Sequence, residues 1–176
     1  MRVFVTGSSG FIGFHLSKKL LEKGHTVHGF DSMNKYYDVK LKKARLKILK
    51  EYKKFFFTKN KIENKKILSQ SILKFKPTAI IHLAAQAGVR YSIENPNAYM
   101  DSNITGTYNV IELAKKINIK HLLIASSSSV YGANKKLPFV EIDKTETQLS
   151  IYAATKKSTE SIAHAYSNIW KIPITM

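Results

Sequence analysis

Short apolar runs alternate along the chain with longer segments whose apolar residues recur at helical spacing. Runs such as "AIIHLAA" and "HLLIAS" are apolar almost throughout, which is typical of strands buried on both faces of a parallel sheet. We expect strands at Val3–Thr6, Thr26–Phe30, Lys54–Thr58, Ala79–Leu83, His121–Ala125 and Pro173–Met176. Helices are expected between them, at Phe11–Lys23, Val39–Tyr52, Lys65–Phe75, Ala98–Lys116 and Ile151–Trp170. Because strands and helices alternate, the pattern predicts an α/β fold in three α/β/α layers, with a doubly wound parallel sheet of the Rossmann type.

The composition excludes several classes of site. The chain has no cysteine, which excludes disulfides and thiolate metal sites, and no cluster of His, Asp and Glu suggests another metal site. No apolar run is long enough to cross a membrane, and the N-terminal "MRVFVTG" does not resemble a secretory signal. We therefore expect a cytoplasmic protein with no metal and no membrane partner.

A net charge of +17 would suit a nucleic acid or another polyanion. The lysines, however, are scattered over the predicted helix faces, and no arginine-rich stretch is interleaved with aromatic residues. We therefore expect no nucleic-acid partner, and a basic nucleic-acid binder is kept as an alternative.

The stretch "VTGSSGFIG" places three glycines where the first strand turns into the first helix. Glycine lets the backbone turn sharply or approach a phosphate, and the helix start at Phe11 offers free N–H groups and the positive end of a dipole. The spacing is G-x-x-G-x-x-G rather than the general fingerprint, but its place between a strand and a helix is the one that a dinucleotide site requires. Gly7, Gly10 and Gly13 therefore predict such a site.

Asp31 closes the second predicted strand. An acid at this position can accept hydrogen bonds from the ribose hydroxyls of adenosine and would repel a 2′-phosphate, which favours NAD over NADP. The alternative is a structural role, in which the Asp31 side chain caps the turn before Ser32.

The segment "YAATK" places Tyr152 and Lys156 on one face of a predicted helix. Tyrosine has a pKa of about 10, and a neighbouring ammonium lowers it, which makes Tyr152 a candidate general base. The same Y-x-x-x-K spacing also begins at Tyr36 and Tyr131, but only the Tyr152 copy lies on a helix that follows the strand ending in "ASSSS". Ser127 at that strand end can share a hydrogen bond with a substrate oxygen. The alternative for the serines is a turn that satisfies the backbone groups at the strand end.

Four stretches carry a family resemblance that covers essentially the whole chain: "TGSSGFIG", "DSMNKYYDVKLKKARL", "HLAAQAGVRYSIENP" and "ASSSSVYG" followed by "SIYAATKKSTE". Together they resemble the extended short-chain dehydrogenase/reductase superfamily, in its NAD-dependent epimerase/dehydratase branch. The long stretches are most similar to UDP-glucuronate 4-epimerases.

The resemblance implies a reaction and a set of site residues. Tyr152, assisted by Ser127, takes the proton of the sugar 4-hydroxyl, the C4 hydride passes to NAD and returns to the other face of the 4-keto sugar, and Lys156 orients the cofactor. The implied cofactor-binding residues are Gly7, Gly10, Phe11, Ile12, Gly13, Asp31, Ile62, Ala84, Ala85, Tyr152 and Lys156. The implied residues for a UDP-sugar substrate are Arg90, Asn103, Ser127 and Ser128. A structural asparagine is the alternative for Asn103, and a surface arginine is the alternative for Arg90.

Two departures from the family pattern bear on the reaction. Members that dehydrate or decarboxylate the sugar carry an acid just before "VYG", whereas this chain has Ser128 and Ser129. Elimination of water needs a further acid and base, so their lack favours epimerisation. After the third strand, Lys61 replaces an expected Asp, which affects the predicted contact with adenine, while Ile62 is kept.

His82 lies at the end of the fourth predicted strand in an apolar context, and we interpret it as structural.

The resemblance also bears on domain organisation. We interpret residues 1–176 as one NAD-binding domain, the N-terminal part of a longer epimerase without its smaller C-terminal substrate domain, and expect this part alone to be inactive or nearly so. The resemblance also suggests a homodimer, formed through helices like those predicted at Ala98–Lys116 and Ile151–Trp170. The competing functions are a UDP-glucose 4-epimerase or related NAD-dependent epimerase, and a non-catalytic NAD-binding protein.

Overall fold

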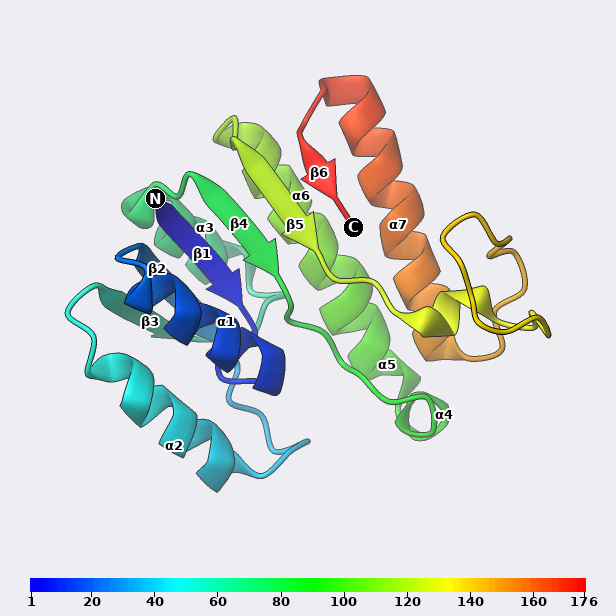
Figure 1. Cartoon of the computed structure of the whole chain (residues 1–176), viewed down its shortest axis with the longest axis horizontal. Coiled ribbons are helices and arrows are strands. Elements are labelled where there is room, and N and C mark those ends of the chain that lie inside the picture. Colours follow the sequence, from blue (N-terminus) through cyan, green and yellow to red (C-terminus); the bar gives the residue numbers. More distant parts are fainter.

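A computed structural model describes all residues from Met1 to Met176. Six strands form one parallel sheet in the order β3-β2-β1-β4-β5-β6 (Figure 1). This is the strand order of the Rossmann fold, so the predicted fold class is confirmed. The strands are β1 (Arg2–Thr6), β2 (Thr26–Asp31), β3 (Phe55–Lys59), β4 (Ala79–His82), β5 (His121–Ile124) and β6 (Ile174–Thr175).

Helices lie on both faces of the sheet (Figure 1). The helices α1 (Phe11–Glu22) and α2 (Val39–Lys50) pack on one face, and α3 (Lys65–Phe75), α6 (Gly106–Lys116) and α7 (Ile151–Trp170) pack on the other. The side chains of alternate residues of β1 point to opposite faces of the sheet and pack in different cores. Val3 and Val5 pack in the core under α1 and α2, whereas Phe4 belongs to the larger core under α3, α6 and α7. No helix combines the length and the apolar character needed to cross a membrane.

The predicted helix Ala98–Lys116 is divided in the structure. It begins as α5 (Pro96–Tyr99), continues as a π-helical segment (Met100–Thr105) and ends as α6. A π-helical segment changes the backbone hydrogen-bond partners but leaves the apolar pattern almost unchanged, so hydrophobic periodicity does not reveal it. Two four-residue elements were also not predicted, namely α4 (Tyr91–Glu94) and a 3₁₀ turn (Ser128–Tyr131), because they are too short to show a period. The predicted bounds of α3 and α7 match the observed ones, and the other predicted boundaries differ by at most two residues.

Phe4 tests the larger core. Its ring is fully buried and lies 5.9 Å from Phe30 and 6.4 Å from Phe75, measured between ring centroids. Phe4→Ala should lower the free energy of unfolding by about 3–5 kcal/mol, because it leaves a cavity between well-packed rings. The matched control is Phe56→Ala on the edge strand, where half of the side chain is exposed; it should cost about 1 kcal/mol or less. Urea unfolding followed by circular dichroism measures both, and equal losses would contradict the assignment of the core.

Candidate functional site

One large cavity, of about 1180 Å³, opens where the carboxyl ends of the strands meet the loops that follow them. Ligands of doubly wound sheets bind at this edge. Every residue that was predicted to bind the cofactor lines the cavity: Gly7, Gly10, Phe11, Ile12, Gly13, Asp31, Ile62, Ala84, Ala85, Tyr152 and Lys156. The structure therefore brings together segments from the beginning, middle and end of the chain.

The glycine turn between β1 and α1 forms the floor of this cavity and is packed backbone against backbone. Gly7 has a φ of +70°, and a Cβ added to it would lie 2.9 Å from the amide nitrogen of Ala84. A Cβ on Gly13 would lie only 2.1 Å from the carbonyl oxygen of Gly7. The N-cap residue of α1 is Gly10, which provides no side-chain cap, so the N–H groups of the first helical turn are free for an anion. The turn therefore fits a diphosphate.

Asp31 is buried at the end of β2, and both oxygens of its carboxylate accept backbone hydrogen bonds. One carboxylate oxygen accepts a hydrogen bond from the backbone N–H of Ser9 at 3.0 Å, and the other accepts one from Met33 at 2.8 Å. The second contact is the turn cap considered as an alternative. The first contact joins the carboxylate to the glycine turn, on the wall of the cavity.

Lys156 and Tyr152 lie on the side of the cavity formed by α7. Only 6% of Lys156 is exposed, and its Nζ donates a hydrogen bond to the carbonyl oxygen of Ala125 at 2.7 Å, just beyond β5. Burial lowers the pKa of Lys156 to about 8, while the negative charge of Glu160 acts in the opposite direction. The Tyr152 ring meets Tyr99 edge-on, with 6.0 Å between the ring centroids. Of the three Y-x-x-x-K copies, this is the one in which both residues line the cavity.

The residues predicted to contact a substrate do not line this cavity. Ser127 is half-buried, and its Oγ accepts a hydrogen bond from the backbone N–H of Ser129 at 3.2 Å, which caps the 3₁₀ turn. This is the structural role considered for the serine run. Ser128 is exposed, and Arg90 is exposed at the start of α4.

Asn103 does not itself line the cavity, although its neighbour Ser102 and its hydrogen-bond partner Gln86 do. It is buried in the π-helical segment, where its Oδ1 accepts a hydrogen bond from the Gln86 N–H and its Nδ2 donates to Gln86 O and Thr155 Oγ1. All these partners are within the protein. The structure therefore places Asn103 as a brace between the loop after β4 and α7, which is the alternative that the sequence left open.

His82 is structural, as the sequence suggested. Its Nδ1 lies 2.7 Å from Thr6 Oγ1 and its Nε2 lies 2.9 Å from Thr107 Oγ1. Because Thr6 Oγ1 already accepts hydrogen bonds from the N–H groups of Leu83 and Ala84, its own proton goes to His82 Nδ1. Burial, reinforced by the charge of Lys156, lowers the pKa of His82 to about 3, so the ring is neutral. This network fixes the loop in which Ala84 lines the cavity.

Several cavity residues were missed by the sequence reasoning, among them Tyr36, Tyr91, Lys42 and Arg45. Lys42 lies on α2 with 6% of its surface exposed, and its Nζ donates to Asn34 Oδ1 at 2.8 Å. Burial lowers its pKa. Both Tyr36 and Lys42 fall in the stretch "DSMNKYYDVKLKKARL", so its resemblance to epimerases was the available signal.

Lys61 lines the cavity beside Ile62 and forms an exposed ion pair with Glu63 at 3.6 Å. The residue at the position of the expected Asp is therefore a cation on the cavity wall. The structure contains no group of three or more His, Asp or Glu side chains placed to hold a metal ion.

Comparisons with known proteins agree with this geometry. The model of the family described as GDP-mannose 4,6 dehydratase matches residues 4–176. A Rhizobium meliloti protein named "Probable UDP-glucuronate 4-epimerase" is 51% identical over 175 residues, which are 99% of this chain and 51% of that protein.

Two solved structures are similar to the whole fold. The UDP-glucuronic acid 4-epimerase of Bacillus cereus, in complex with UDP-glucuronic acid and NAD, superimposes with a TM-score of 0.90 at 34% identity, over 99% of this chain and 55% of the other. The UDP-glucose 4-epimerase of Thermotoga maritima, with UDP-glucose, gives a TM-score of 0.86 at 27% identity, over 99% and 53%. The chain thus spans about half the length of the proteins it matches. With the family model matching nearly all of its residues, the chain belongs to the GDP-mannose 4,6-dehydratase family of NAD-dependent epimerases and dehydratases.

Proposed function

We propose that the protein is an NAD-dependent UDP-sugar 4-epimerase that interconverts UDP-glucuronate and UDP-galacturonate, and that this chain supplies its cofactor site. The observation that carries the proposal is that Tyr152 and Lys156 line the same cavity as the Gly7–Gly13 turn. A candidate base and a candidate cofactor site therefore line one continuous cavity. The similarity to the Bacillus cereus epimerase, which binds UDP-glucuronic acid and NAD, supports the choice of substrate and cofactor.

The cavity residues fit NAD from end to end. The free N–H groups at the start of α1 would hold the diphosphate, and the Asp31 carboxylate would accept from the adenosine ribose. Tyr152 and Lys156 would lie at the nicotinamide end. When bound, NAD supplies an acceptor that takes the hydride from the sugar C4 and returns it.

Tyr152 acts as the general base in this proposal, and Lys156 supplies the charge that stabilises its phenolate. Because the pKa of Lys156 is about 8, its ammonium remains mostly protonated at pH 7 despite its burial. Ser127 follows Ser126, which lines the cavity, and we propose that the Ser127 hydroxyl hydrogen-bonds the sugar 4-oxygen beside Tyr152. Ser128 and Arg90, exposed next to the cavity loops, are proposed contacts of the substrate.

The residues after β5 favour epimerisation over dehydration. The 3₁₀ turn that follows this strand contains Ser128 and Ser129, and no carboxylate. Elimination of water from the 4-keto sugar needs a further acid and base near this position. Without them, return of the hydride is the step that remains.

A UDP-glucose 4-epimerase is the second candidate, supported by the similarity to the Thermotoga maritima structure. Its lower identity, 27% against 34% for the glucuronate enzyme, makes it the weaker one. We also propose a homodimer through α6 and α7, where Tyr108, Ile169 and Trp170 leave large apolar side chains exposed.

Gly13→Ala tests the cofactor site. Its methyl group would overlap the Gly7 carbonyl oxygen, so the turn must open and NAD binding should weaken at least tenfold. Gly24→Ala is the matched control, because nothing lies within 4 Å of its added Cβ and Gly24 does not line the cavity. Its φ of +80° should cost about 1 kcal/mol of stability without changing NAD affinity. Titration calorimetry with NAD measures both, and unchanged affinity in Gly13→Ala would rule out this placement of the cofactor.

Tyr152→Phe in the complete gene product tests the reaction. The variant keeps the ring but loses the base, so the rate of conversion of UDP-glucuronate to UDP-galacturonate should fall about 100-fold or more. Tyr131→Phe, in a Y-x-x-x-K copy outside the cavity, should remain within about twofold of the wild type. Proton NMR follows the two sugars. Unchanged UDP-glucuronate with converted UDP-glucose in the wild type would favour the second candidate, and full activity of Tyr152→Phe would refute the mechanism.

Lys156→Met tests the buried charge through stability. Because burial lowers the pKa of Lys156 from 10.5 to about 8, the unfolded state holds more protons between these values, and wild-type stability rises as the pH increases through this range. The variant should therefore be about 2 kcal/mol more stable than the wild type at pH 7, after the lost Ala125 hydrogen bond is counted. The advantage should vanish before about pH 10.5 and reverse above it, because the variant still lacks the Ala125 hydrogen bond. Urea unfolding across this range measures it, and a pH-independent difference would contradict the shift.

A further inference from the structure

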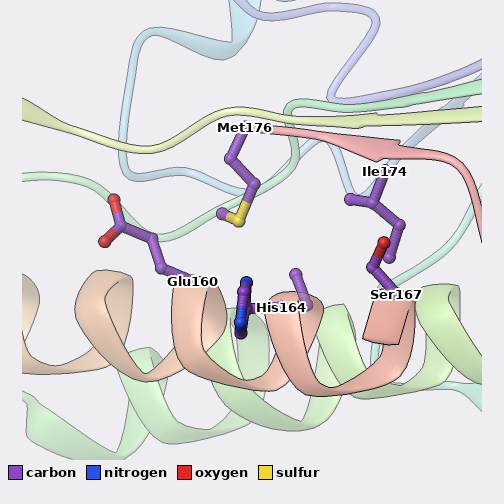
Figure 2. A pocket seen from close by; sticks show the side chains of 6 residues that line it. Glu160, His164, Ser167, Ile174 and Met176 are labelled. Atoms are coloured by element: carbon purple, nitrogen blue, oxygen red, sulfur yellow. The ribbon is translucent and has the colours of Figure 1, made fainter. Parts of the chain in front are cut away.

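Glu160 lies on α7 one turn beyond Lys156 and does not line the cavity of the proposed reaction. It is half-buried and borders a separate cavity of about 260 Å³ between α7 and β6, where Figure 2 shows it near His164 and Met176. Its carboxylate is therefore a charge that the proposed reaction does not use directly.

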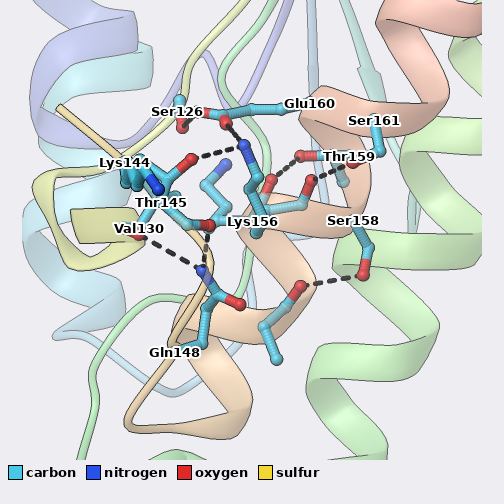
Figure 3. Close-up of polar contacts among 12 residues, drawn as sticks. Ser126, Val130, Lys144, Thr145, Gln148, Lys156, Ser158, Thr159, Glu160 and Ser161 are labelled. Carbon is cyan, nitrogen blue, oxygen red and sulfur yellow. Dashed lines mark hydrogen bonds and ion pairs between the residues drawn. The ribbon is translucent and has the colours of Figure 1, made fainter. Parts of the chain in front are cut away.

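Both oxygens of the Glu160 carboxylate are engaged (Figure 3). Oε1 accepts a hydrogen bond from the Ser126 hydroxyl at 2.6 Å, and Oε2 accepts one from Lys157 Nζ at 3.2 Å. Lys157 Nζ also donates to Thr145 Oγ1 at 2.5 Å. The carboxylate thus connects α7 to the end of β5 and, through Lys157, to the segment that leads into α7.

The Ser126 contact lies next to the contact made by Lys156. Lys156 holds the carbonyl oxygen of Ala125, and Glu160 holds the side chain of the following residue, Ser126. Lys156 and Glu160, which lie one turn apart on the same face of α7, therefore hydrogen-bond two successive residues just beyond β5. Ser127 comes next in the chain.

The segment before α7 adds to the same arrangement. Gln148 Nε2 donates to the carbonyl oxygens of Val130 and Thr145, at 3.3 and 2.7 Å (Figure 3). The 3₁₀ turn after Ser127 and the residue that Lys157 contacts are therefore held by one glutamine. These hydrogen bonds join α7, the segment before it and the residues on both sides of Ser127 into one network.

We propose that Glu160 is a positioning residue of the reaction, which holds the end of β5 through Ser126 so that Ser127 stays beside Tyr152. The proposal rests on the proposed epimerase function. Charge-assisted hydrogen bonds are short and directional, which suits a contact that fixes a backbone. A misplacement of about 1 Å in a group that contacts the substrate can lower a rate about 100-fold, so such a contact has a measurable effect.

The Glu160 charge gives a second readout. Glu160 faces Lys156 from the same helix, His82 faces it from β4, and Lys157 neutralises part of the carboxylate charge. Since His82 is neutral above about pH 3, Glu160 is the group whose charge supports the protonated form of Lys156. Removing this charge should lower the pH at which Lys156 loses its proton.

Two variants in the complete gene product separate the hydrogen bond from the charge. Glu160→Ala removes both, and kcat should fall roughly 10- to 100-fold while KM for the UDP-sugar changes less than about threefold. Glu160→Gln keeps an acceptor for Ser126 but removes the charge, so kcat should recover to within about threefold and the alkaline limb of the pH profile should move to lower pH. An unmoved alkaline limb, or a Gln variant as slow as the Ala variant, would overturn the proposal.

Glu112→Ala is the matched control. Glu112 also pairs with a lysine three residues away and accepts a hydroxyl hydrogen bond, from Tyr166, but lies on α6 outside the site. Its loss should affect stability and leave kcat within about twofold. Equal losses of kcat in Glu112→Ala and Glu160→Ala would show that the effect of Glu160 is general destabilisation and would overturn the proposal.

Amide hydrogen exchange tests the contact without any activity. Exchange in residues 126–130 should accelerate at least tenfold in Glu160→Ala, return towards the wild-type rate in Glu160→Gln, and stay unchanged in Glu112→Ala. Unchanged exchange in Glu160→Ala overturns the positioning role. A different outcome is that the variants show this exchange pattern while the wild-type protein converts neither UDP-glucuronate nor UDP-glucose. That result would overturn the proposed function and the effect of Glu160 on catalysis, but not the contact between Glu160 and Ser126.

Discussion

The proposed site depends on the hydrogen bond from the Lys156 ammonium to the carbonyl oxygen of Ala125, which is 2.7 Å long and buried. It joins α7 to the end of β5 and so determines where Tyr152, one turn earlier on the same helix face, meets the cavity. Burial removes water from the ammonium and lowers its pKa. The carbonyl oxygen replaces part of the lost hydration, and the nearby Glu160 carboxylate favours the charged form. A cation is thereby kept in the wall of the cavity that Tyr152 also lines, in a place where water alone does not stabilise it.

The floor of the cavity, at the glycine turn, is held by close backbone packing and by an uncharged hydrogen-bond network. There the backbone of Gly7 lies against the loop at Ala84 too closely for any side chain, and the uncharged His82 ring holds the Thr6 hydroxyl that anchors this loop. The α7 side of the cavity thus depends on the charged Lys156 ammonium, whereas the side at the glycine turn depends on an uncharged His82 ring. Lys156 connects them, because its charge is one reason why His82 stays neutral.

The sequence was most informative where burial or backbone geometry leaves one solution. The apolar run that contains His82 can be a strand covered on both faces, and the glycine spacing between a strand and a helix fits a close backbone contact. The sheet and the tight glycine turn could therefore both be predicted. The break in the predicted helix Ala98–Lys116 could not, because it involves the contact of Asn103 with the distant Gln86. Lys42 looked like a surface residue of a polar helix, and only the folded loop at Asn34 makes it a cavity residue. Side-chain contacts between segments that are distant in the sequence do not alter the hydrophobic periodicity from which elements are predicted.

The proposed site requires Lys156 to be a buried ammonium with a lowered pKa in the cavity that Tyr152 also lines. The most direct measurement is an NMR titration of the protein carrying lysine labelled with ¹⁵N at Nζ, with Lys156→Met used to assign the signal. Because Lys156 is buried, we expect its midpoint at about pH 8. A midpoint at the usual lysine value of about 10.5 would contradict it, because the amine would then lie in water and not in the wall of the cavity.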